Sequence, residues 1–124
     1  HKGEHIMRIL ILDDNEGILD LLKCELEEVG AEVWAYSHPG DALTDLIHNK
    51  MDLIITDFEM PQMDGVSFSA RARLLQKTPI FLYTASSEVI VSENIIMRFD
   101  KMDMNKMINF VKKYKNSPEW VVNS

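Results

Sequence analysis

The sequence predicts an α/β fold in which a parallel β-sheet is covered by helices on both faces. Five short apolar runs typical of buried strands alternate with segments whose apolar residues recur at helical spacing. This alternation indicates βα units joined by right-handed crossovers. In addition, two of the apolar runs end in aspartates. These side chains are therefore expected at the carboxyl edge of the sheet, where open α/β folds bind their ligands.

The first half of the chain contains two predicted strand–helix units. Residues 7–12 (MRILIL) form the first strand, and a helix follows from Asn15, a suitable N-cap, to a stop at Gly30. The alternating residues 31–36 (AEVWAY) form the second strand. After a Pro-Gly pair, residues 41–50 have their apolar side chains on one helical face, which predicts the second helix.

The second half repeats the pattern three times. The third strand is predicted at residues 52–56, and a helix follows at 66–77. The fourth strand covers 80–84 and the fifth 95–99, before a last helix at 103–115. The methionines of this last helix recur at helical spacing, which indicates core packing.

The connection between the fourth and fifth strands is unusually short. Residues 85–94 provide ten positions, whereas a parallel crossover needs about 10–12 residues including its helix. The middle of this segment is β-branched and weakly helical. We therefore expect its helix, the fourth in chain order, to be short or irregular.

The natural arrangement of these elements is a doubly wound, flavodoxin-like three-layer α/β/α fold with the strand order 2-1-3-4-5. In that order the first and third strands are neighbours, so Asp13, Asp14 and Asp57 are expected to converge. Thr84 and Lys101 follow the fourth and fifth strands and would complete the same rim.

Length and composition indicate one domain, because 124 residues are too few for two ordinary cores. We expect this domain to cover residues 7–115. Residues 1–6 resemble an expression-vector remnant or a disordered N-terminus, and residues 116–124 a C-terminal tail or the start of a linker.

The charge and the cysteine content argue against several classes of function. A formal charge of −7 argues against direct nucleic-acid binding, and no apolar run approaches the ~20 residues of a membrane span. Cys24 is the single cysteine, which excludes an internal disulfide and fits a cytoplasmic location. Its leucine-rich surroundings predict a packed thiol rather than a reactive one.

The residues at the predicted rim indicate phosphoryl chemistry. Three converging carboxylates repel one another unless a cation joins them, and oxygen ligands suit Mg²⁺, with Mn²⁺ as an alternative. Binding a phosphoryl group requires a cation and a hydroxyl donor that face the carboxylate, and Lys101 and Thr84 would supply these two groups. Asp57 would then be the nucleophile and form an acyl phosphate.

Over residues 7–115 the chain resembles the response-regulator receiver domains of two-component signalling. The Asp13-Asp14 pair, the string DFEMPQMDG that begins at Asp57, the segment PIFLYTAS and Lys101 stand in the order of that family. The long string is the most specific of these motifs, while an isolated Asp-Asp pair is common.

The resemblance implies a role for each acidic position. Asp57 would accept the phosphoryl group, and Asp14 and Asp57 would bind Mg²⁺ directly. Asp13 would act mainly through a water molecule on the metal, and the backbone carbonyl of Glu59 would be a further ligand. The side chain of Glu59 is expected to be exposed.

The resemblance also implies partners. A sensor histidine kinase or phosphotransfer protein would supply the phosphoryl group, and Thr84 and Lys101 would hold its oxygens. The target would be a downstream protein or a covalently linked output domain, and the chain would be a monomer or a phosphorylation-dependent dimer. It would catalyse only its own phosphorylation and dephosphorylation.

One position departs from the family pattern. An aromatic switch residue usually stands three positions before the lysine, where this chain has Arg98, followed by Phe99. Arg98 would not bury in the same way without a partner. We expect the readout to proceed through altered packing, with Phe99 as a substitute or with dimerisation on another face.

Other interpretations remain open at this point. Each polar position also has a purely structural explanation. The aspartate pair would form a helix-capping turn, Thr84 would be an ordinary β-branched strand residue, and Lys101 would be a solvated surface lysine. A separate alternative is a phosphorylation-independent, receiver-like interaction domain that keeps the fold and uses the acidic rim as a docking surface. An aspartate-nucleophile phosphohydrolase would use Glu59 as proton donor, but the chain has no room for a cap domain. A flavodoxin would require a phosphate-binding loop after the first strand, which is missing.

Overall fold

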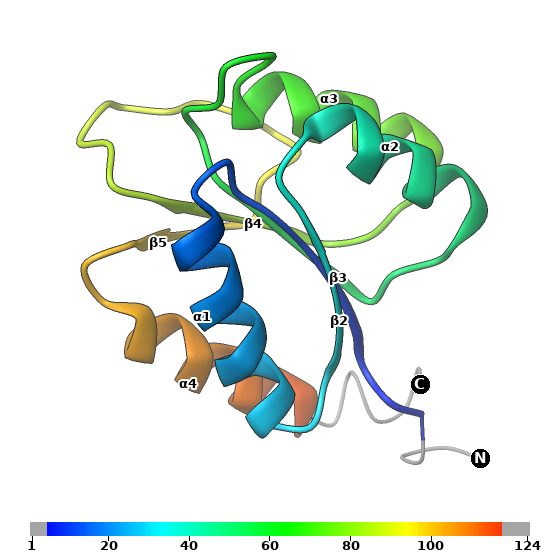
Figure 1. Ribbon diagram of the computed structural model, residues 1–124, viewed down its shortest axis with the longest axis vertical. Coiled ribbons are helices and arrows are strands. Elements are labelled where there is room, and N and C mark those ends of the chain that lie inside the picture. Colours follow the sequence, from blue (N-terminus) through cyan, green and yellow to red (C-terminus); the bar gives the residue numbers. More distant parts are fainter. Residues whose placement is uncertain (1–4, 118–124) are drawn as a thin grey trace.

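The computed structural model describes residues 5–117, and Figure 1 shows strands alternating with helices along this part of the chain. The elements are β1 (Arg8–Leu12), α1 (Glu16–Glu28), β2 (Glu32–Tyr36), α2 (Pro39–His48), β3 (Leu53–Thr56), α3 (Gly65–Leu75), β4 (Ile80–Thr84), β5 (Met97–Asp100) and α4 (Met104–Lys115).

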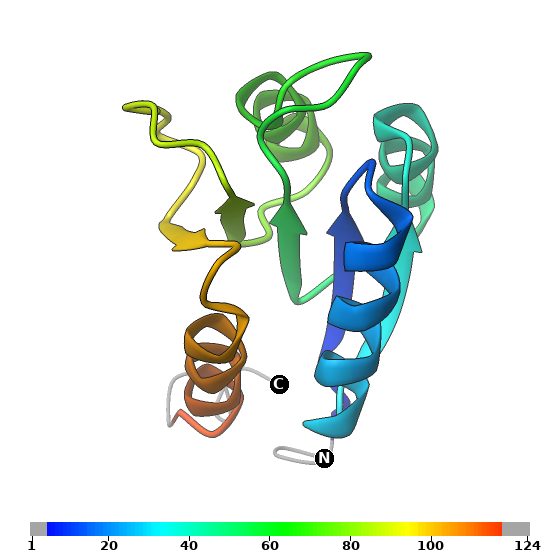
Figure 2. The same cartoon turned by 60° about the vertical axis from the view of Figure 1, so that its left-hand side comes forward.

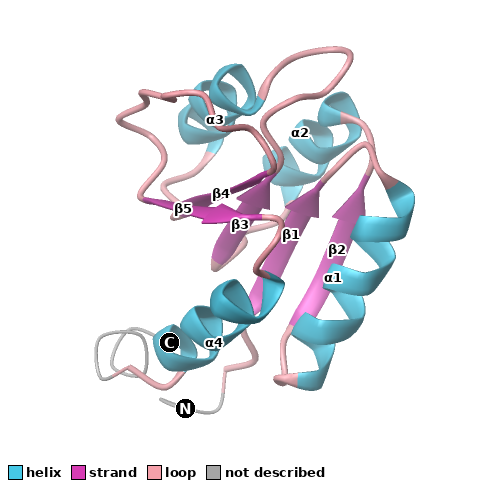
Figure 3. Ribbon diagram, turned by 90° about the vertical axis from the view of Figure 1, so that its left-hand side faces the viewer, coloured by secondary structure: helices cyan, strands magenta, loops and turns pink. Residues whose placement is uncertain are grey.

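The five strands form one parallel sheet in the order β2-β1-β3-β4-β5, which confirms the predicted fold class (Figure 3). β1 and β3 are neighbours in register, with Leu12 opposite Thr56. On the other side of β3, β4 pairs with β5 so that Thr84 lies opposite Asp100. The next residue after each of these strand ends therefore emerges at one edge of the sheet.

Helices cover both faces of the sheet. α1 and α4 lie on one face and α2 and α3 on the other (Figures 1 and 2). Each face buries its own apolar cluster, because the strand residues alternate between the two sides. β1 illustrates this: Ile9 and Ile11 belong to the cluster under α1 and α4, and Leu10 and Leu12 belong to the cluster under α2 and α3.

Helix α1 begins and ends where its sequence signals stand. The side chain of Asn15 accepts a hydrogen bond from the backbone N–H of Ile18 at 3.0 Å, which satisfies one of the free donors of the first turn. Gly30, just beyond the helix, has a φ of +95°, a left-handed conformation that favours glycine. The expectation of a packed thiol is wrong, because Cys24 lies on the exposed side of α1.

The connection between β4 and β5 differs from the prediction. Residues 85–96 contain no helix, so the described chain has four helices and none of them covers β5 on the α3 side. β5 also starts two residues later than predicted, at Met97. The segment is too short and too β-branched for a packed helix, and its Val89 side chain is 92% exposed.

Phe99 and Arg98 point to opposite sides of β5. Phe99 is 4% exposed and contacts Phe81 and Phe110, with ring centroids 5.6 and 5.5 Å away. It therefore belongs to the core under α4 and does not take the surface position that Arg98 occupies. The idea that Phe99 substitutes for the switch aromatic is not supported by this packing.

Both predicted terminal segments lie largely outside the described residues, which exclude 1–4 and 118–124. His5 is described, and its Nε2 lies 2.9 Å from Oδ2 of Asp52. Within the described part of the chain, every helix is too short or too polar to cross a membrane.

Candidate functional site

Asp13 and Asp57 lie side by side because they follow neighbouring strands. The N–H of Asp57 donates to the carbonyl of Leu12 at 2.8 Å, and the N–H of Asp13 donates to Tyr36 at 3.1 Å. These bonds extend the sheet by one residue beyond β1 and β3 and fix both backbones. The two aspartates are 2% and 6% exposed, so each carboxylate has lost most of its water.

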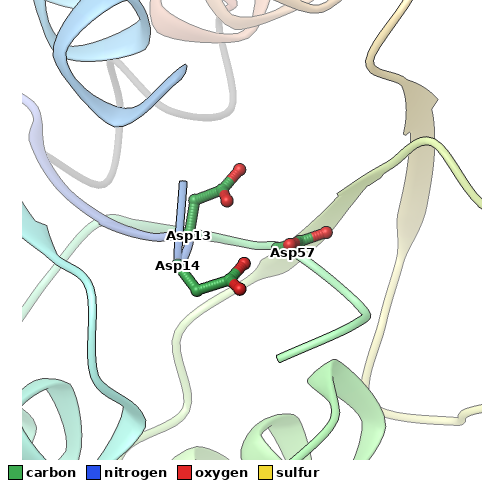
Figure 4. Close-up of side chains that lie close together, drawn as sticks. All are labelled: Asp13, Asp14 and Asp57. Carbon is green, nitrogen blue, oxygen red and sulfur yellow. The ribbon is translucent and has the colours of Figure 1, made fainter. Parts of the chain in front are cut away.

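Asp14 completes an acidic cluster with these two residues. One carboxylate oxygen from each of Asp13, Asp14 and Asp57 lies within 4.8 Å of the others. Figure 4 shows the three side chains close together, with Asp13 and Asp14 consecutive in the chain and Asp57 beside them at the end of β3. Asp14 is exposed, so solvent reaches the cluster from its side.

Lys101 reaches this cluster from β5. Its N–H donates to the carbonyl of Thr84 at 3.1 Å, which holds it against the end of β4. Its Nζ lies 2.6 Å from Oδ2 of Asp13 and 3.2 Å from Oδ2 of Asp57. The side chain is 13% exposed, so Lys101 is a partner of the carboxylates and not a solvated surface lysine.

Thr84 lies at the end of β4 and is buried. Its Oγ1 accepts a hydrogen bond from the N–H of Ser86 at 3.0 Å. Together with Asp14, Asp57 and Lys101 it lines an open cavity of about 380 Å³. The structure therefore brings the five predicted polar side chains to one edge of the sheet, as the strand order requires.

The electrostatic balance of the cluster is unfavourable for a negative charge on Asp57. Burial, and then the charge of Asp13, raise the pKa of Asp57 from its ordinary value of 3.8 to about 6. Lys101 and the N–H of Phe58, which donates to Oδ1 of Asp57 at 2.7 Å, pull the pKa the other way. One lysine thus faces three carboxylates, and a further cation would relieve the repulsion.

The donors present fit a divalent cation. Oδ2 of Asp13 is fully buried and accepts no well-aligned hydrogen bond within residues 5–117; its close partner is the ammonium group of Lys101. Three carboxylates with one open, solvent-exposed side match Mg²⁺, which binds few protein oxygens and keeps several waters. Glu59 lines the same cavity, and its side chain is exposed as expected.

The loop after Asp57 is held against the site by Gly65. A Cβ atom at this position would lie 2.2 Å from the carbonyl oxygen of Asp57, so only glycine fits. The N–H of Gly65 donates to the carbonyl of Phe58 at 2.7 Å, and Asp64 caps α3 by accepting from Ser67 at 2.8 Å. This packing closes the loop back onto the end of β3.

Three contacts of the site were not predicted from the sequence. The N–H of Asn15 donates to Oδ1 of Asp13 at 2.9 Å, so the residue that caps α1 also positions a carboxylate. The hydroxyl of Tyr83 donates to the carbonyl of Lys101 at 3.4 Å. Ser86 contacts Thr84 through its backbone. Backbone donors leave no signature in a residue type, whereas the small residues after Thr84 offered a weak hint of close packing.

Curated relatives of the chain include transcriptional regulators. The chain is 35% identical over 80 residues to the transcriptional regulatory protein SrrA of Staphylococcus aureus, a match that covers 64% of this chain and 33% of SrrA. The chain therefore spans about a third of the length of the curated relatives it matches.

Solved structures with the same fold cover nearly the whole chain. The response regulator protein TrrA from Thermotoga maritima, in complex with Mg²⁺-BeF, has a TM-score of 0.79 and 30% identity, covering 87% of this chain and 98% of TrrA. The signal receiver domain of an HD domain-containing protein from Pseudomonas fluorescens has a TM-score of 0.80. It shows the fold alone, since its identity is 23%; the match covers 90% of this chain and 98% of that domain.

The family comparison agrees with the site and the fold. The model of the response regulator receiver domain matches residues 9–113, a range that contains all three aspartates, Thr84 and Lys101. The chain belongs to the family of response regulator receiver domains.

Proposed function

We propose that the chain accepts a phosphoryl group on Asp57 from a phosphohistidine donor, in a reaction that depends on Mg²⁺ or Mn²⁺, and that this changes its interaction surface. The observation that carries the proposal is the buried carboxylate of Asp57, 3.2 Å from the ammonium of Lys101 and beside two further aspartates. Such an arrangement supplies a nucleophile together with positive charge for the incoming oxygens.

In the proposed reaction, a carboxylate oxygen of Asp57 attacks the phosphorus atom. The bond from phosphorus to the histidine nitrogen breaks, and an acyl phosphate forms on Asp57. The ammonium of Lys101 and the hydroxyl of Thr84 then bind oxygens of the transferred group: the ammonium offsets their negative charge, and the hydroxyl donates a hydrogen bond. Lys101 already contacts the carboxylates of both Asp13 and Asp57, so its ammonium group lies beside the proposed nucleophile.

The metal would be held by Asp14 and Asp57 directly, by Asp13 through water, and by the backbone carbonyl of Glu59. When bound, it supplies positive charge to the phosphoryl oxygens and offsets the repulsion among the carboxylates. The acidic cluster and the Mg²⁺-BeF complex of the similar protein TrrA support this assignment.

The partners follow from the family. We infer that a sensor histidine kinase or phosphotransfer protein is the donor, and that the target is a separate protein or an output domain joined to this chain. The name of SrrA, a transcriptional regulatory protein, supports an output domain in a longer relative. The chain would act in the cytoplasm and would turn over only its own phosphoryl group.

Labelling with acetyl phosphate and Mg²⁺ tests the proposal. The wild-type protein should be phosphorylated, and Asp57→Asn should not, because an amide is not a nucleophile for this transfer. Asp20→Asn is a matched control, since Asp20 is exposed on α1. Chelation of the metal should abolish labelling of the wild type. Equal labelling of wild type and Asp57→Asn would exclude Asp57 as the acceptor and favour an interaction domain that works without phosphorylation.

A further inference from the structure

The segment between β4 and β5 borders the candidate site although it lacks a helix. Ala85 and Ser86 line the cavity that contains Asp57 and Thr84. Carbonyl groups that would be paired inside a helix need other partners here. The structure supplies partners for two of these carbonyls, those of Ser86 and Glu88, from one side chain of β5.

That side chain is Arg98. Its Nη1 donates to the carbonyl of Glu88 at 2.6 Å, and its Nη2 donates to the carbonyl of Ser86. Arg98 itself is fixed within the sheet, where it lies in register opposite Leu82 of β4. A guanidinium group presents its donors in a rigid planar fork, so it holds two carbonyls at once in one geometry. The start of segment 85–96 is therefore tied to β5.

Ser86 is bound on both of its backbone groups. Its carbonyl accepts from Arg98, and its N–H donates to Oγ1 of Thr84 at 3.0 Å. Its side chain also accepts from the N–H of Glu88 at 3.1 Å. Since the hydroxyl of Thr84 accepts on one side, its own proton remains available for a group in the cavity. The orientation of the Thr84 hydroxyl thus depends on where Ser86 is held.

We propose that Arg98 is a positioning residue for phosphoryl transfer, which acts through Ser86 to orient the hydroxyl of Thr84 toward the phosphoryl group on Asp57. This role rests on the proposed function. Arg98 does not line the cavity beside Asp57, so its influence passes along the contacts from Arg98 to Ser86 and from Ser86 to Thr84. If Arg98 had a purely structural role, it would stabilise segment 85–96 without changing the orientation of the Thr84 hydroxyl.

The test combines amide exchange with transfer kinetics. Amide exchange of Ser86, measured without any phosphodonor, should become about tenfold faster in Arg98→Ala, because opening of the segment exposes this N–H. The rate constant for phosphorylation by acetyl phosphate should fall about tenfold, as expected for a misplaced catalytic group. Mg²⁺ affinity should stay unchanged, since the acidic cluster is intact.

Further variants separate the proposed role from a general loss of structure. Arg98→Lys keeps the charge but lacks the rigid planar fork that fixes the two carbonyls in one geometry, so it should resemble Arg98→Ala. In a Thr84→Ala background, Arg98→Ala should slow phosphorylation by less than about twofold, because the pathway through Thr84 is already removed. Arg71→Ala is the control, as Arg71 is an exposed arginine on α3; its exchange and kinetics should match the wild type.

The failures of the two proposals are distinguishable. Unchanged Ser86 exchange in Arg98→Ala overturns the role of Arg98, whether or not the protein is phosphorylated. A wild-type phosphorylation rate in Arg98→Ala, or an equally large effect in the Thr84→Ala background, overturns that role and leaves the proposed function in place. Absence of any labelling of the wild type overturns the proposed function and the role that depends on it.

Discussion

Replacing Asp57 by asparagine should stabilise the metal-free protein at neutral pH. In the wild type, burial and the nearby charge of Asp13 raise the pKa of Asp57 from 3.8 to about 6. The folded state therefore binds the proton more tightly than the unfolded state and is penalised when the carboxyl group ionises. Asparagine is never ionised, and Lys101 keeps its contact with Asp13 at 2.6 Å.

The magnitude follows from the size of the pKa change. A rise from 3.8 to about 6 corresponds to about 3 kcal/mol. Because the cavity is open to solvent on one side, screening reduces this figure, and we expect ~1–3 kcal/mol. Below pH 3.8 the carboxyl group is protonated in both the folded and the unfolded state, so it does not destabilise the fold. The destabilisation grows as the pH rises and reaches its full value above pH 6. The difference between Asp57→Asn and wild type should thus be largest above pH 7 and small near pH 4.

Urea unfolding followed by circular dichroism measures this difference. Wild type and Asp57→Asn should be compared at about pH 4 and about pH 7.5 with a chelator present, because most of the pKa change from 3.8 to about 6 lies between these two values. Asp20→Asn, at an exposed position, should change the free energy of unfolding by less than about 0.5 kcal/mol at either pH. The reasoning is refuted if Asp57→Asn is less stable than wild type at pH 7.5, or if its advantage is the same at both pH values.

Three further predictions concern the metal, the loop and the core. Mg²⁺ at about 100 times its dissociation constant should raise the free energy of unfolding of the wild type by about 2.7 kcal/mol, as measured by urea unfolding. The gain should be much smaller in Asp14→Asn. An equal gain in both proteins would contradict binding at the acidic cluster. Gly65→Ala should lower the free energy of unfolding by about 1–3 kcal/mol, because its Cβ would lie 2.2 Å from a backbone oxygen. Gly40→Ala meets no atom within 4 Å and should be near neutral. Similar effects of the two substitutions would show that the loop is not packed as described. Phe99→Ala should lower the free energy of unfolding, measured by heat or urea, by about 3–5 kcal/mol, since the ring is buried among aromatic side chains. Met102 is 90% exposed, so Met102→Ala should change the free energy of unfolding little. A small effect of Phe99→Ala would place its ring outside the core.

The order of the sheet could be predicted because strand and helix signals agree along most of the chain. The runs that became β1, β3 and β4 are mostly apolar and are buried at nearly every position, as is typical of strands covered on both faces. Once that order is fixed, the convergence of Asp13 and Asp57 follows from topology alone, since each comes directly after the end of a strand. Periodicity was therefore sufficient for the fold and for the placement of the acidic residues.

Periodicity was insufficient where tertiary contacts determine whether a side chain is buried or how a segment is held. Cys24 stands between leucines in sequence, but α1 buries Leu22 and Leu26 and leaves Cys24 exposed. Phe99 could be taken for a surface aromatic, whereas the alternation of β5 turns it into the core. Residues 85–94 lack a clear helical period, and the arginine that binds the carbonyls of Ser86 and Glu88 lies in β5. Such a contact joins two segments that no local pattern connects.

The acceptor position is the central claim, and chemical trapping tests it most directly. After phosphorylation by acetyl phosphate with Mg²⁺, borohydride reduces an aspartyl phosphate to homoserine, and mass spectrometry of the resulting peptides identifies the converted residue. The proposed function predicts homoserine at position 57 in the wild type and none when the phosphodonor is omitted. Conversion at Asp13 or Asp14 instead, or no conversion anywhere in a protein that is demonstrably labelled, would contradict it.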